Sequence, residues 1–120
     1  MGYRVLVVDD NDVNLRLIEK ILEMEGYQVT LAQSGQEALG LLSQPFDLAI
    51  LDVMMPEMNG FELCRRLRSS APHAGIPILL LTALSGENER SMAKTVGANA
   101  ILSKPFDMDS FKKRVAEYLT

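Results

Sequence analysis

The chain has 120 residues, 48% of them hydrophobic, and a formal net charge of −4 at pH 7. That length suits one domain and excludes a second, so we expect residues 1–120 to fold as a single unit without disulfides or a structural metal. The negative charge argues against a nucleic-acid-binding surface. No apolar run approaches the roughly 18 residues of a membrane span, and residues 1–4 are unlike a signal peptide, so the sequence predicts a cytoplasmic protein without membrane insertion.

Strand and helix patterns alternate along the chain. Short apolar runs predict five strands, over 4–8, 27–32, 48–51, 78–81 and 100–102. Helical spacing of apolar residues predicts five helices, over 13–24, 36–43, 60–69, 87–96 and from 108 onward. Gly26 and Gly97 suit C-terminal caps, and Asp107 can cap the start of the last helix. Right-handed crossovers turn this repeat into the α/β class, as a doubly wound parallel sheet with leading strand order 2-1-3-4-5.

The apolar positions also predict which helix faces are buried. The first helix would bury Leu17, Ile18, Ile21 and Leu22. The helix over 87–96 has only a thin apolar face and should be loosely anchored; this face is Met92, Ala93 and Val96. The last helix would face the sheet with Phe111, Val115, Tyr118 and Leu119.

Two residues with reactive side chains have structural explanations. Cys64 is the single cysteine and lies at helical spacing with Leu63 and Leu67, which indicates a buried thiol rather than a nucleophile. His73 is the single histidine and falls in the loop over 70–77, where a solvated side chain is expected.

Polar side chains collect where the predicted strands end. Asp9 and Asp10 follow the first strand and Asp52 follows the third, and these two strands are neighbours in the predicted order. Close carboxylates repel by roughly 4 kcal/mol per pair at an effective dielectric near 20, so a cation or protons must offset them. Oxygen ligands without histidine or thiolate favour Mg²⁺, with Mn²⁺ also possible, over Zn²⁺.

Thr82 and Lys104 end the fourth and fifth strands and add a hydroxyl and a point charge at the same edge. A carboxylate, a divalent metal, a hydroxyl donor and a lysine are what phosphoryl transfer onto an aspartate requires. Asp52 would attack the phosphorus, Mg²⁺ and Lys104 would neutralise oxygens, and Thr82 would donate a hydrogen bond.

Four motifs in this order resemble the receiver domain of two-component response regulators. They are V-V-D-D-N at 7–11, D-V-M-M-P-E-M-N-G at 52–60, L-L-T-A at 80–83 and G-A-N-A-I-L-S-K-P-F at 97–106. The resemblance implies that Asp52 is the phosphoacceptor and that Asp9 and Asp10 are the acidic pair. It also implies that the metal is bound by Asp10, Asp52 and the backbone carbonyl of Met54, and that the Lys104-Pro105 bond is cis.

The resemblance extends to partners. It implies a histidine kinase or a histidine phosphotransfer protein as phosphoryl donor, and a downstream protein effector that binds the face formed by the fourth helix, fifth strand and fifth helix. The chain ends after the fifth helix, so we expect no output domain in residues 1–120. A single-domain regulator and a receiver from a larger protein both remain open.

Some positions depart from the family pattern. Ile101 stands where receivers often carry an aromatic residue that rotates on activation, so we expect a smaller change on that face. In receivers the side chains at the positions of Met54 and Leu84 flank the path of the hydrolytic water; both are apolar here and cannot orient it, which predicts a long-lived phosphorylated form. Asn99 and Ala100 replace two acids that pair in dimers of winged-helix members.

The sequence leaves three alternative functions open. A phosphohydrolase of the haloacid dehalogenase type usually has a second acid two residues after its nucleophile, where this chain has Met54, and needs room for a cap domain. A flavin-binding domain needs a phosphate loop after the first strand, where Asp9 and Asp10 would repel the phosphate. An interaction domain that is never phosphorylated is the third.

Overall fold

The computed structural model describes residues 2–71, 73–84 and 86–119. Their strands and helices alternate as predicted, five of each. The strands are β1 (Arg4–Val8), β2 (Gln28–Ala32), β3 (Leu48–Asp52), β4 (Ile78–Thr82) and β5 (Ala100–Ser103). The helices are α1 (Asp12–Met24), α2 (Gly35–Leu39), α3 (Gly60–Arg68), α4 (Glu87–Val96) and α5 (Met108–Tyr118).

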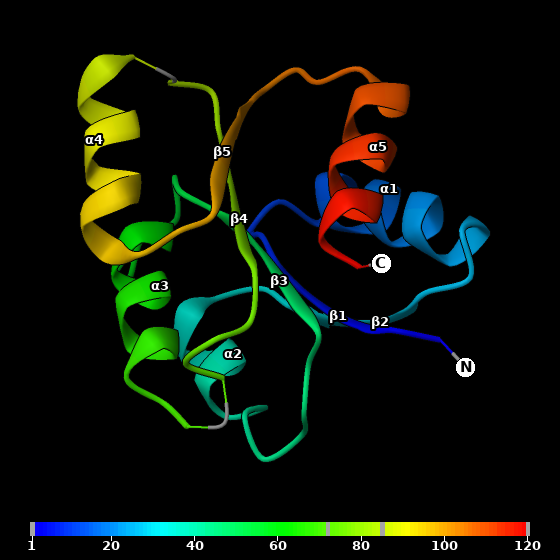
Figure 1. The fold of residues 1–120 in the computed structure, drawn as a ribbon, viewed down its shortest axis with the longest axis horizontal. Helices are drawn as coiled ribbons and strands as arrows, with labels where there is room; N and C mark the ends of the chain where they lie inside the picture. The colour runs from blue at the N-terminus through cyan, green and yellow to red at the C-terminus, as the bar shows by residue number, and fades with distance from the viewer. Residues whose placement is uncertain (1, 72, 85, 120) are drawn as a thin grey trace.

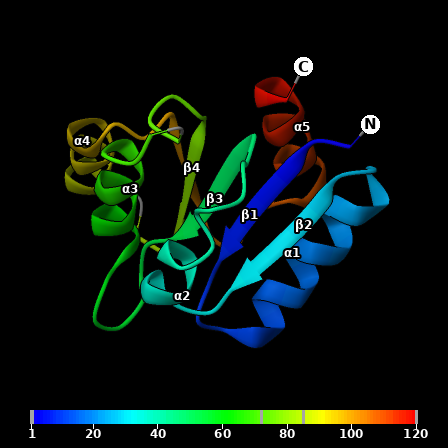
Figure 2. The same ribbon diagram turned by 90° about the horizontal axis from the view of Figure 1, so that it is seen from below.

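All five strands run parallel in one sheet with order β2-β1-β3-β4-β5, which confirms the predicted topology. Helices α1 and α5 cover one face of the sheet, and α2, α3 and α4 cover the other (Figures 1 and 2). The central strands β3 and β4 are buried along their whole length. The fold is therefore an α/β sandwich of three layers with a hydrophobic core on each face of the sheet.

Local signals explain most of the helix boundaries. Asn11, Ser34, Asn59 and Asp107 cap the starts of α1, α2, α3 and α5 through side-chain oxygens that accept backbone N–H groups. Gly97 ends α4 in the left-handed conformation, with φ 87°. The predicted caps at Gly97 and Asp107 are thus confirmed.

Several details of the sequence-based prediction were wrong. The helix predicted over 36–43 ends at Leu39, because Gly40 begins a series of turns before Pro45. Leu17 is 51% exposed and Leu15 is buried instead, since the buried stripe of α1 runs through Leu15 and Ile18. Met92 is 42% exposed, which leaves Ala93 and Val96 as the buried face of α4.

His73 is the largest correction. The predicted solvated histidine is buried, at 1% exposure, and its Nε2 lies 2.9 Å from the carbonyl oxygen of Gln44. Its ring is 5.9 Å from that of Phe46, so the α3–β4 loop closes over the α2–β3 loop. Pro72, in the same predicted loop, lies outside the described residues.

Two other predictions are confirmed. Cys64 is fully buried in the core between the sheet and α3. The Lys104-Pro105 peptide bond is cis. None of the helices within the described ranges is both long and apolar enough to cross a membrane.

Candidate functional site: an acidic cluster at the carboxyl edge of the sheet

Three carboxylates meet where β1 and β3 end. Asp9, Asp10 and Asp52 each place an oxygen within 4.8 Å of the others. Asp9 and Asp52 are buried, whereas Asp10 is exposed. The register that sets Val8 beside Leu51 brings these strand ends together, as the sequence predicts for neighbouring parallel strands.

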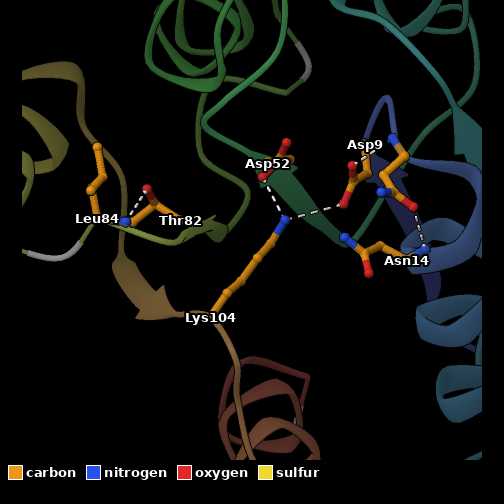
Figure 3. A network of polar contacts seen from close by, with 7 residues as sticks. Asp9, Asn14, Asp52, Thr82, Leu84 and Lys104 are labelled. Atoms are coloured by element: carbon orange, nitrogen blue, oxygen red, sulfur yellow. Dashed lines mark hydrogen bonds and ion pairs between the residues drawn. The ribbon is translucent and has the colours of Figure 1, made fainter.

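Lys104 reaches into this cluster from the end of β5 (Figure 3). Its Nζ donates to Asp52 Oδ1 at 2.7 Å and to Asp9 Oδ2 at 3.4 Å. The lysine side chain is 21% exposed, so the contact is only partly open to water. A single cation therefore bridges the two buried carboxylates, and this charge-assisted geometry holds both in place.

The cluster shifts the pKa values of two of its residues, Asp52 and Lys104. Burial raises the pKa of Asp52 above its ordinary 3.8, and the charges of Asp9 and Asp10 add to this against the opposing effect of Lys104. Burial lowers the pKa of Lys104, but the carboxylates of Asp52 and Asp9 outweigh it and leave that pKa raised. Negative charge at this edge is thus only partly compensated.

Thr82 contributes a hydroxyl from the end of β4. It is fully buried, and its Oγ1 accepts the backbone N–H of Leu84 at 3.0 Å. Figure 3 shows the tip of Lys104 pointing toward Asp52, with Thr82 on one side of this pair and Asp9 on the other. Because β4 lies between β3 and β5, the hydroxyl, carboxylate and ammonium come from three adjacent strands.

The β3–α3 loop fits tightly against the end of β3. A Cβ on Gly60 would lie 2.5 Å from the carbonyl oxygen of Asp52, so only glycine allows this approach. Glu57 has φ 68°, a left-handed conformation that is unusual for a residue with a side chain. The Asn59-Gly60 pair, a turn signal in the sequence, is therefore also what positions the backbone beside Asp52.

Two apolar side chains flank the site. Met54 is 58% exposed and Leu84 is 54% exposed. Both line a cavity of about 440 Å³ between the β3–α3 and β4–α4 loops, together with Val53, Met55, Asn59, Phe61, Thr82 and Glu89. The space beside the acidic cluster thus has mostly apolar walls.

The structure brings together Asp9, Asp10, Asp52, Thr82 and Lys104, all predicted from strand ends. Sequence reasoning missed Asn14, which lies on the first turns of α1 near the crevice (Figure 3). Asn14 and Lys104 line a second cavity of about 330 Å³, with Leu17, Ile18, Pro105 and Phe106. Asn11 caps the start of α1 by accepting the backbone N–H of Asn14. Recognising this cap in the sequence would have placed Asn14 in the first turn of the helix, near the strand ends.

The donor set suits a hard divalent cation. Three carboxylates supply oxygen ligands, and neither His73 nor Cys64 is near enough to appear in the cluster of the described residues. Oxygen-only sites with one exposed side favour Mg²⁺, which keeps several waters. The residues present therefore fit a magnesium site.

A parallel α/β sheet with paired acids, a hydroxyl and a lysine at its carboxyl edge defines a phosphoacceptor class of protein. Residues 5–116 match the family described as the response regulator receiver domain. The chain belongs to this family. It is a phosphoacceptor signalling domain rather than an enzyme that turns over a separate substrate, and the phosphohydrolase and flavin-binding alternatives are wrong.

Individual relatives agree with this assignment. The chain is 43% identical over 108 residues to the response regulator PleD of Caulobacter vibrioides, covering 89% of this chain and 24% of PleD. It is 42% identical over 120 residues to the response regulator MprA of Mycolicibacterium vanbaalenii, covering 99% of this chain and 51% of MprA. The chain thus spans about a quarter to a half of the length of these relatives.

Solved structures share the fold at lower sequence identity. The chemotaxis protein CheY4 of Vibrio cholerae has a TM-score of 0.94 and 34% identity, with 98% of this chain and 99% of that chain covered. The DrrB receiver domain, solved in its BeF3-activated form, has a TM-score of 0.90 and 28% identity, with 99% and 98% covered. Both have the same overall fold as this chain.

Proposed function

We propose that Asp52 is the residue of this receiver domain that accepts the phosphoryl group. The observation that carries the proposal is the contact at 2.7 Å between Lys104 Nζ and Asp52 Oδ1. It orients one carboxylate oxygen and leaves the other free to attack. In the transfer, a bond forms between Asp52 and phosphorus, the bond from phosphorus to the donor nitrogen breaks, and the leaving imidazole keeps that electron pair and takes a proton.

The other site residues have separate tasks. Lys104 lies where it can neutralise charge on the phosphoryl oxygens after the transfer, and Thr82 can donate a hydrogen bond to one of them. Asp9, Asp10, Asp52 and the backbone carbonyl of Met54 are the proposed ligands of Mg²⁺, with Mn²⁺ as a substitute. Bound there, the ion would supply positive charge against the phosphoryl oxygens.

Receiver domains are phosphorylated by histidine kinases, and we propose such a kinase or a histidine phosphotransfer protein as donor for this chain. The proposed effector surface is formed by α4, β5 and α5. Met92, which is 42% exposed, and the partly buried Ile101 lie on these elements. Because Ile101 replaces a large aromatic side chain, we expect activation to change this surface modestly.

The test is the intact mass after incubation with acetyl phosphate, with and without Mg²⁺. We expect a gain of one phosphoryl group that depends on Mg²⁺, with Asp52→Ala gaining none. Asp47→Ala is a matched control, since Asp47 bonds to the backbone N–H of Arg4 outside the cluster. Equal phosphorylation of wild type and Asp52→Ala would contradict the assignment, and no gain in any protein would favour an interaction domain that is never phosphorylated.

A further inference from the structure

The most accessible sulfur atom near the site belongs to Met54. It follows Asp52 by two residues and its side chain is 58% exposed, whereas Met55 and Met58 of the same loop are each 7% exposed. Met54 lines the cavity of about 440 Å³ that Thr82 also lines. A small polar oxidant can therefore reach this thioether from the same space that opens beside the site.

The thiol of the chain is protected from such an oxidant. Cys64 is fully buried and its Sγ lies 3.5 Å from the carbonyl oxygen of Val96. Burial also raises the pKa of the Cys64 thiol, which disfavours the reactive thiolate. Oxidation of sulfur under mild conditions is thus directed to exposed methionines, which in the described part of the chain are Met24, Met54, Met92 and Met108.

We infer that Met54 is an oxidation site and that its sulfoxide shortens the lifetime of the phosphorylated domain. The inference rests on Asp52 as phosphoacceptor. In the modifying step, hydrogen peroxide transfers one oxygen atom to the thioether: the O–O bond breaks, an S–O bond forms, sulfur is oxidised by two electrons and water leaves.

The expected effect follows from what the sulfoxide adds. Met54 and Leu84 are apolar, so neither side chain can orient the water that attacks an acyl phosphate. A sulfoxide oxygen accepts hydrogen bonds, and one such bond to the attacking water should accelerate hydrolysis about fivefold. Leu84 cannot be oxidised in this way, and Met55, which also lines this cavity, is only 7% exposed, so peroxide should act on this wall mainly through Met54.

The modification is reversible in principle. Methionine sulfoxide reductases return the side chain to the thioether. The phosphorylated state would then have two lifetimes, a long one under reducing conditions and a short one after oxidation. The same domain would report both the kinase signal and the oxidative state of its surroundings.

The experiment compares decay rates in a background in which Met24, Met92 and Met108 are replaced by leucine. The protein is treated with hydrogen peroxide, the peroxide is removed, and peptide mass mapping quantifies oxidation at Met54. The treated and untreated proteins are then phosphorylated with acetyl phosphate and Mg²⁺, and the intact mass is followed over time. We expect about fivefold faster loss of the phosphoryl group in the treated protein.

Two variants make the result specific. Met54→Leu in the same background should show the same decay rate before and after peroxide. Met54→Gln, which carries a permanent hydrogen-bonding group, should decay faster than Met54→Leu without any peroxide. Equal decay of treated and untreated protein with Met54 fully oxidised would overturn the inference, as would an unreactive Met54. Phosphorylation that fails in every sample would instead contradict Asp52 as acceptor.

Discussion

The two edges of the sheet handle charge in opposite ways. At the carboxyl edge, three carboxylates lie together and Lys104 bridges two of them. At the amino edge, the guanidinium of Arg68 lies between α3, α4 and the start of β5. It donates to Ile76 O at 2.6 Å, Asn99 Oδ1 at 2.8 Å, Gly97 O at 2.9 Å and Ala74 O at 3.2 Å.

This contrast separates stability from function. The Arg68 guanidinium donates four hydrogen bonds that join α3 to the α3–β4 and α4–β5 loops, so its contacts favour the folded state. The carboxylates at the other edge repel one another, and burial raises the pKa of Asp52, so the ionised state of Asp52 opposes folding. The contacts of Arg68 at the amino edge stabilise the fold, whereas the ionised Asp52 at the carboxyl edge destabilises it. A bound cation or a phosphoryl group would change the free energy of this carboxylate cluster.

Replacing Arg68 should weaken the contacts at the amino edge and give the largest change in stability. Arg68→Ala removes four charge-assisted hydrogen bonds, including the partly buried one to Ile76 O, and should lower the free energy of unfolding by about 2 kcal/mol. Chemical denaturation measures this, with Arg65→Ala as control, because Arg65 is exposed and pairs only at 3.7 Å with Glu62. Unchanged stability of Arg68→Ala would show that water replaces the guanidinium at no cost.

Neutralising Asp52, the proposed phosphoacceptor, should sharpen the comparison at the carboxyl edge. A raised pKa means that the ionised Asp52 is less favourable in the folded than in the unfolded chain, so Asp52→Asn should stabilise the protein by about 1 kcal/mol without metal. Thermal unfolding with and without Mg²⁺ tests this. Mg²⁺ should stabilise wild type more than Asp52→Asn, and a destabilised variant would mean that the Lys104 contact outweighs the repulsion.

The smallest effect is expected at Glu57, in the loop that leads away from Asp52. Its side chain is exposed and its φ is 68°, so Glu57→Gly should relieve strain and stabilise the protein by less than about 1 kcal/mol. Glu57→Ala keeps the strain and serves as the control in denaturant titrations. Equal stability of the two variants would place the strain elsewhere in the loop.

Sequence alone could predict the carboxyl edge because its residues are tied to strand ends. Asp9, Asp52, Thr82 and Lys104 each follow an apolar run, and parallel strands bring such positions to one edge. The alternating strands and helices, with right-handed crossovers, then restrict the possible sheet orders to very few. Local pattern and topology were sufficient for these residues.

The features that the sequence did not predict depend on contacts between segments that are distant along the chain. Burial of His73 requires the α2–β3 loop, 29 residues away at Gln44, to cover it. The contact of Arg68 with Asn99 joins residues 31 apart, and neither has a pattern that suggests it. The phase of α1, which exposes Leu17 and buries Leu15, depends on how the whole helix settles on the sheet. Helical spacing predicts that one face of the helix is apolar, but it does not fix which of two neighbouring apolar positions is the more deeply buried.

The hydrogen bond from the backbone N–H of Leu84 to Thr82 Oγ1 gives the hydroxyl a double task. As an acceptor it holds the first residues after β4, and it still has its own proton to donate. If the hydroxyl turns to donate that proton to a phosphoryl group on Asp52, its oxygen moves, and the hydrogen bond from the Leu84 N–H must move with it or weaken. One oxygen atom would therefore connect the proposed phosphoryl contact to the backbone at Leu84.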